Sequence, residues 1–131
     1  MSLRDHTVQV ATMLAVADLD RSLAFYRDRL GFEVREEQPG IALLGHGSML
    51  LYLVADSPPT PDKPGVWLSP PREAERTPVN LVFRVGDCRA VYAELQSAAV
   101  EFLTPPRQPP WGGWRCFGRD PDGYLFEIEQ P

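Results

Sequence analysis

The sequence has little that would support a disulfide framework, a membrane span or a nucleic-acid interface. It holds only two cysteines, Cys88 and Cys116, and its N-terminus lacks the apolar core of a signal peptide. No apolar run approaches the roughly 20 residues that a membrane-spanning helix needs. The formal net charge is −5 and the Lys and Arg residues are scattered, which argues against binding to a phosphate backbone. We therefore expect a cytoplasmic protein with free thiols and with neither nucleic-acid nor membrane partners.

Histidines and nucleotide-binding motifs are also scarce. His6 precedes the first expected strand and His46 lies in a Gly-His-Gly turn, which are positions typical of surface histidines. The chain has no P-loop or dinucleotide fingerprint, so Gly112 and Gly113 are interpreted as a turn or bulge. Cys116 lies on an expected strand without an evident His partner, which favours an inert buried thiol over a nucleophile.

The sequence contains enough apolar residues for a core, and they are organised as two similar halves. The stretch VQVATMLAV alternates as a strand does, and Asp18 or Asp20 can cap the helix that follows. Further along, VNLVFRVGD resembles ATMLAVAD and again precedes a helical pattern. Residues 8–56 and 79–130 are therefore predicted to be two β-α-β-β-β modules, with one short or irregular strand in the second. Each half is too small to bury its own sheet, so we expect the two to form a single domain over residues 1–131.

Residues 57–78 connect the halves and contain seven of the fourteen prolines. Proline removes the backbone donor that a strand ladder needs, so we expect a long loop here. Trp67 lies within this loop. It either folds over a pocket or packs on the surface and holds the loop in place.

Two motifs at opposite ends of the chain resemble those of a known family. VADLDRSLAFYRDRLGFEV and WGGWRCFGRDPDGYLFEIEQ are similar to the N- and C-terminal signatures of the vicinal oxygen chelate superfamily, which includes glyoxalases, bleomycin-resistance proteins and extradiol dioxygenases. The resemblance implies an α+β fold in which two βαβββ modules form a cup-shaped mixed sheet around a cleft. It also implies a homodimer, as in many members. Because this fold hosts many chemistries, the resemblance alone does not give an activity.

Metal-dependent members of the family hold a divalent ion with four side chains. By resemblance, those positions fall here at Ala11, at or near Leu51, at Asn80 and at Glu127. Only Glu127 is a strong ligand, since Ala and Leu have no donor atom and the Asn amide is a weak neutral one. We therefore expect no cofactor, and a divalent metal is the less favoured alternative.

Apolar and aromatic residues are expected to line the cleft. The ligand-binding candidates are Met13, Leu51, Trp67, Asn80, Trp111, Trp114, Arg115, Tyr124 and Glu127. Trp114 and Arg115 are adjacent on a strand, so only one of them can face the cleft. The alternative for each Trp is packing against the other module or a dimer partner.

Three functions remain open from the sequence. The favoured one is metal-free binding of a small apolar or aromatic molecule, as in the bleomycin-resistance branch that the chain resembles. The second is a metal-dependent lyase, isomerase or dioxygenase that acts on vicinal oxygens. The third is a metal-free enzyme in which Glu127 acts as general base. Glu127 could instead be a structural carboxylate that accepts hydrogen bonds from Asn80, Arg115 or water.

Overall fold

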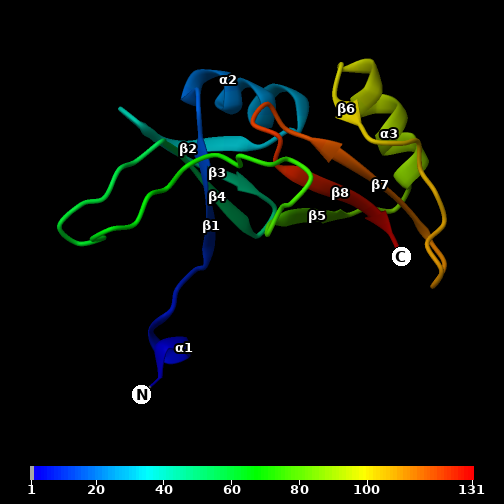
Figure 1. Ribbon diagram of the computed structural model, residues 1–131. Coiled ribbons are helices and arrows are strands. Elements are labelled where there is room, and N and C mark those ends of the chain that lie inside the picture. The colour runs from blue at the N-terminus through cyan, green and yellow to red at the C-terminus, as the bar shows by residue number, and fades with distance from the viewer. Residues whose placement is uncertain (1) are drawn as a thin grey trace. The chain divides into compact units, whose positions relative to one another are not determined.

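The computed structural model describes residues 2–131, which form strands and a few short helices (Figure 1). In chain order they are α1 (Leu3–His6), β1 (Ala11–Val16), α2 (Leu19–Ala24), the π-helical turn η1 (Phe25–Arg29), β2 (Glu33–Gln38), β3 (Ile41–His46), β4 (Met49–Ala55), β5 (Asn80–Arg84), α3 (Cys88–Ser97), β6 (Glu101–Phe102), β7 (Trp114–Arg119) and β8 (Leu125–Gln130). The short β6 is the irregular strand expected in the second half.

Each half of the chain forms one four-stranded sheet. The strand order is β1-β4-β3-β2 in the first and β5-β8-β7-β6 in the second. The pairs β1–β4 and β5–β8 are parallel, whereas all other ladders are antiparallel. We call β1–β4 with α2 the first module, and β5–β8 with α3 the second. The same order and directions in both modules confirm the α+β fold of two βαβββ units.

In each sheet, one face is covered by the helix of its own module. α2 packs on the first sheet, and α3 packs on β7 and β8 of the second (Figure 1). Alternate residues of a strand point to opposite faces, so each sheet also has an open face that its helix does not cover. The open faces carry the candidate site residues described below.

The helix-covered faces form the two cores. In the first module, the covered residues are almost inaccessible to solvent: Leu14, Val16, Leu44, Leu51 and Leu53. In the second module, Phe126 makes edge-to-face contacts with Phe83 and Phe102, at 6.1 and 5.9 Å between ring centroids. A Cβ atom at Gly118 would collide with the Phe126 ring, so the glycine makes room for it.

The helices begin at equivalent aspartates, as the repeat in the sequence suggests. The Asp18 carboxylate accepts a hydrogen bond from the Arg21 amide at 3.1 Å, and the Asp87 carboxylate accepts one from the Ala90 amide at 3.0 Å. Each satisfies a backbone donor that the first turn of a helix leaves without a partner. Of the two caps considered for the first helix, Asp18 is therefore the one used.

The first strand is shorter than its sequence pattern predicts. The alternation begins at Val8, but β1 begins at Ala11, and Val8 and Val10 are exposed. β1 pairs with β4 from Ala11 opposite Leu50, just after the turn that opens β4. The residues before Ala11 therefore have no strand partner in this ladder.

The proline-rich loop contains more local order than expected. Ser57 and Leu68 form an antiparallel bridge, with N–O distances of 2.9 and 3.0 Å. Trp67 lies beside this bridge and is exposed. The chain divides into two compact units within the loop, between Pro70 and Pro71.

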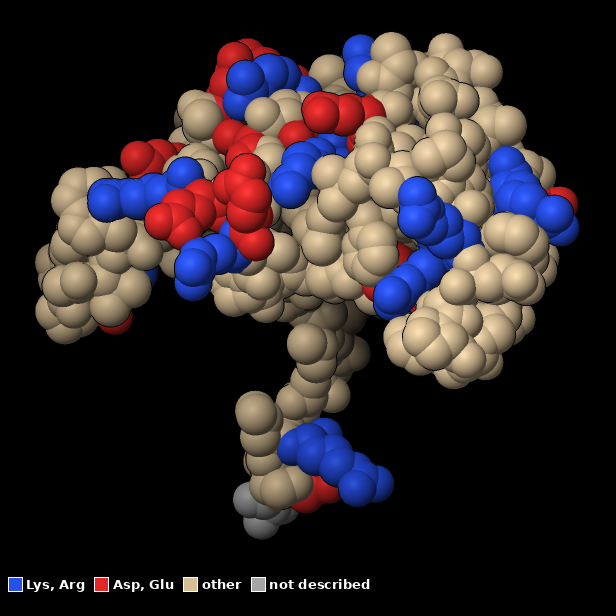
Figure 2. All heavy atoms as spheres, turned by 45° about the vertical axis from the view of Figure 1, so that its right-hand side comes forward, with Lys and Arg blue, Asp and Glu red and all other residues tan. Residues whose placement is uncertain are grey.

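Charge is mixed on the surface. Acidic and basic side chains lie next to one another on the face drawn in Figure 2. Across residues 2–131, no helix is both long and apolar enough to cross a membrane.

Candidate functional site

Glu127 lies on the open face of the second sheet, next to Asn80. The Asn80 side-chain amide donates a hydrogen bond to Glu127 Oε1 at 3.0 Å, and Glu127 is only 9% exposed. Its partners across the strands are Val82 on β5 and Phe117 on β7. The carboxylate is therefore held by one amide donor between apolar side chains, which is the contact with Asn80 that the sequence suggested. Arg115, the other partner considered, makes no hydrogen bond to it.

Arg115 is on the same open face, and its guanidinium lies near two aromatic rings. Its guanidinium carbon is 4.9 Å from the centroid of Trp111 and 5.2 Å from that of Phe117. Both distances are within the range of cation–π interactions. Trp111 itself is 71% exposed, so much of its ring is available to a ligand.

Trp114 and Tyr124 do not share that surface. Trp114 is on the helix-covered side of β7, where the Arg89 guanidinium of α3 lies 4.5 Å from its ring centroid. Tyr124 is buried just before β8, and its backbone amide donates to Asp120 Oδ1 at 2.8 Å. Arg115 is thus the member of the Trp114–Arg115 pair that lies on the open face, and both aromatic residues pack within the second module.

In the first module, the open-face residue opposite Met13 is Tyr52. Met13 is 44% exposed and pairs with Tyr52, while Leu51 lies fully buried on the face that α2 covers. Glu127 has the same ladder position in the second module, where it pairs with Val82. The register therefore makes Tyr52 the counterpart of Glu127.

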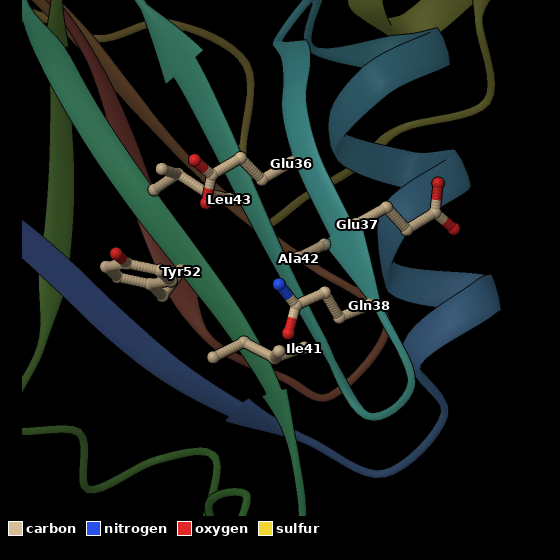
Figure 3. Close-up of a pocket in the computed structure, with 7 residues that line it drawn as sticks. All are labelled: Glu36, Glu37, Gln38, Ile41, Ala42, Leu43 and Tyr52. Atoms are coloured by element: carbon tan, nitrogen blue, oxygen red, sulfur yellow. The ribbon is translucent and has the colours of Figure 1, made fainter.

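A hollow of about 120 Å³ lies on the first module, and it is lined by Glu36, Glu37, Gln38, Ile41, Ala42, Leu43 and Tyr52 (Figure 3). A register shift in β2 places Glu36 opposite Leu43. Figure 3 shows Glu36 beside Leu43 and Gln38 beside Ile41, whereas Glu37 points away from them. The hollow combines an apolar floor with a carboxylate and an amide at its rim, a composition that can hold part of a small molecule.

The four positions implied by the resemblance do not fit a divalent metal ion. In the first module, Ala11 has no donor atom and Leu51 is inside the core. In the second, Glu127 offers a carboxylate, but Asn80 uses its amide to donate to it. No group of three or more His, Cys, Asp or Glu side chains among residues 2–131 is placed to hold a metal ion. Protein-bound divalent ions need several such donors.

Cys88, the first residue of α3, lies next to Cys116 of β7. Their sulfur atoms are 3.9 Å apart, both side chains are buried, and neither is in a disulfide. Burial raises the pKa of both thiols, and that of Cys116 rises to about 12. Because the thiolate is the reactive form, these are poor nucleophiles, in agreement with the inert thiol expected for Cys116.

The raised pKa of Cys116 predicts a loss of stability at alkaline pH. The unfolded chain releases this proton near the ordinary thiol value of 9.0, whereas the native protein keeps it up to about 12. Unfolding is therefore favoured as the pH rises through that interval, by up to about 1.4 kcal/mol for each pH unit. In urea titrations over this range, Cys116→Ala should show a shallower fall in the free energy of unfolding than the wild type. If the free energy of unfolding falls equally steeply with pH in both proteins, the raised pKa of Cys116 is contradicted.

Sequence reasoning missed two residues of the open faces. Tyr52 was overlooked because the run MLLYLV is apolar throughout. Without alternating polar residues, the sequence does not show which of its side chains lie on the open face. Arg107 pairs with Arg115 in an antiparallel bridge. The signal for this pair was present, since both arginines flank the PPWGGW turn.

Comparisons with known proteins agree with this architecture. The model of the Glyoxalase/Bleomycin resistance protein/Dioxygenase superfamily matches residues 5–128. No curated protein matches the sequence. Among solved structures, the chain is similar to a glyoxalase/bleomycin resistance protein/dioxygenase from Nocardioides (23% identity, TM-score 0.77), with 95% of this chain and 82% of that one covered.

Two further structures show the same fold. TioX from Micromonospora sp. ML1 has 20% identity and a TM-score of 0.76, with 95% and 98% of the two chains covered. Lactoylglutathione lyase from Agrobacterium tumefaciens has 22% identity and a TM-score of 0.71, with 95% and 94% covered. At these identities the likeness establishes the fold rather than an activity. With a family model that spans nearly all of its length, the chain belongs to the Glyoxalase/Bleomycin resistance protein/Dioxygenase superfamily.

Proposed function

We propose that this protein binds a small apolar or aromatic molecule on the open faces of its sheets, without a metal ion held by the protein. The observation that carries the proposal is the apolar environment of the Glu127 carboxylate. Glu127 is nearly buried, accepts a hydrogen bond from Asn80, and has an apolar residue opposite it on each neighbouring strand. Such a surface suits an apolar ligand with one polar group, whereas a divalent ion would require further donors.

The apolar surface available to a ligand supports the same proposal. Met13 and Trp111 are both exposed on the part of the chain that the structure describes. Tyr52 and Leu43 line the hollow of the first module. Large side chains of this kind supply contact area for planar molecules.

Metal titration tests the proposal directly. We expect zinc, nickel, manganese and iron(II) to leave the thermal midpoint of the purified protein within about a degree, because a ligand stabilises a protein only by binding its folded form. A metal ion that binds the folded protein and is present at 100 times its Kd would instead raise the free energy of unfolding by about 2.7 kcal/mol. That increase corresponds to a rise of several degrees in the thermal midpoint. Metal content measured by mass spectrometry provides the second readout.

A matched pair of variants separates a real site from surface binding of metal. Glu127→Ala removes the candidate ligand, whereas Glu129→Ala removes a carboxylate two residues along the same strand, one that lies 3.6 Å from Arg84. A stoichiometric ion that is lost in Glu127→Ala but kept in Glu129→Ala would overturn the proposal and indicate a metalloenzyme.

A second candidate function is a metal-free enzyme that uses Glu127 as general base. The observation in its favour is the open-face position of a carboxylate with a single amide donor. Once a ligand is found, for instance by thermal shift with planar aromatic compounds, Glu127→Gln distinguishes the two. Lost turnover with retained binding would support the base, whereas the absence of any turnover in the wild type would support simple binding.

A further inference from the structure

Two arginines are held side by side at the start of β7. The Arg107 amide donates to the Arg115 carbonyl at 2.9 Å, and the Arg115 amide donates back to the Arg107 carbonyl at 2.9 Å. Residues that exchange both hydrogen bonds in an antiparallel bridge are directly opposite each other and project to the same face, with Cβ atoms roughly 5 Å apart. Because Arg115 is on the open face of the second sheet, Arg107 projects to that face as well.

Neither guanidinium has an anionic partner. Within residues 2–131, no carboxylate lies at ion-pair distance from Arg107 or Arg115, and neither side chain forms a hydrogen bond. The nearest carboxylate in the ladder belongs to Glu129, which is opposite Arg115, but its ion-pair partner is Arg84 at 3.6 Å. Like charges directly opposite each other are unfavourable in a sheet. An anion bound between the two arginines would remove this repulsion.

The guanidinium of Arg115 also has two aromatic neighbours. Trp111 and Phe117 lie at cation–π distance from the guanidinium. A cation–π contact does not use up the N–H donors of the guanidinium, which can still donate to an acceptor. A carboxylate matches these donors, because two parallel N–H···O bonds can form at once. The exposed ring of Trp111 provides a flat apolar surface beside the same guanidinium.

We propose that Arg107 and Arg115 bind the carboxylate of a planar aromatic acid whose ring packs against Trp111. This inference rests on the proposed function, and it specifies the class of ligand that the open face of the second module would take. The ligand is thus an anion held by two arginines.

The test compares two probes of the same shape, of which one is an anion with two acceptor oxygens and the other is neutral with one acceptor oxygen and an NH2 donor. Naphthalene-2-carboxylate carries the anionic group, and naphthalene-2-carboxamide is its neutral analogue. By isothermal titration calorimetry, we expect the wild type to bind the carboxylate about 10-fold or more tighter than the carboxamide, because hydrogen bonds to charged groups are the stronger kind. Arg107→Gln and Arg115→Gln should each remove most of that advantage and leave carboxamide binding within about threefold.

Two further variants serve as controls. Arg89→Gln removes a positive charge from α3, on the opposite, helix-covered side of the same sheet, so carboxylate binding should be unchanged within about threefold. Arg115→Lys keeps the charge but loses the planar fork, and it should weaken the carboxylate more than the carboxamide. Circular dichroism and the thermal midpoint show whether each variant is folded.

Several outcomes would overturn the inference. Equal affinity for both probes in the wild type would reject the arginine site while leaving the proposed function in place. Equal losses of carboxylate affinity in Arg89→Gln, Arg107→Gln and Arg115→Gln would do the same. Absence of binding by the carboxylate would also reject it. If inorganic phosphate binds as tightly as the carboxylate, with the same dependence on Arg107 and Arg115, the site takes free oxyanions and the aromatic part of the proposal is wrong.

Discussion

Replacing Phe126 with alanine should lower the free energy of unfolding by about 3–5 kcal/mol, the usual cost of deleting a buried aromatic ring. The ring is 1% exposed and contacts Phe83 and Phe102. The space it leaves faces Gly118, which has no side chain to fill the cavity. Urea denaturation followed by circular dichroism measures the effect.

Leu125→Ala is the matched control for this variant. Leu125 precedes Phe126 on β8 and is only partly buried, on the open face of the sheet. Its loss should cost about 1 kcal/mol, since the side chain is not enclosed by the core. Comparable losses in the two variants would show that the helix-covered face is not the core of the second module.

Gly113→Ala should be nearly as damaging, by about 3 kcal/mol or more, because two costs combine at this position. Its φ is +72°, a left-handed conformation that side chains disfavour. A Cβ atom would also collide with the backbone carbonyl oxygen of Gln130. The chain would have to move where it enters β7, so we also expect the contact between Trp111 and Arg115 to be disturbed.

The neighbouring glycine isolates the steric part of this effect. Gly112 has φ +93°, but nothing lies within 4 Å of the position its Cβ would occupy. Gly112→Ala should therefore show only the conformational cost, about 1 kcal/mol. Thermal and urea unfolding of both variants measure the two losses in the free energy of unfolding. Equal losses would mean that the chain relieves the collision with Gln130 at little cost.

The fold was predictable from the sequence because its signals are local and occur twice. Asp18 and Asp87 cap equivalent helices, and alternating runs mark the strands on either side. In the last strand, LFEIEQ, the apolar residues Phe126 and Ile128 alternate with the carboxylates Glu127 and Glu129, and the structure has the two pairs on opposite faces of the sheet. The length of β1 was predicted wrongly, since Val8 and Val10 alternate as a strand does but find no partner in the ladder.

The candidate site was less predictable, since it depends on register and on side chains from distant segments. Because β4 is an apolar run, the sequence does not show whether Leu51 or Tyr52 lies on the open face. The pairing of Met13 with Tyr52 in the structure places Tyr52 there. Likewise, Trp114 and Arg115 alternate on β7, and only the position of α3 shows that Trp114 lies beneath it. Arg107 lies opposite Arg115 through an isolated bridge, and the only sequence signal for this pair is that one arginine lies on each side of the PPWGGW turn.

The parallel pairing of the first and last strand of each module has a consequence for the order of folding. The hairpins β3–β4 and β7–β8 join neighbours in the chain, so they can close quickly. By contrast, β1 must find β4, and β5 must find β8, across the helix and two other strands. We expect the hairpins to form first and the parallel strands to dock late, as the slow step that completes each sheet. Until then β4 and β8, which end up in the interior of their sheets, each expose one unpaired edge to other chains.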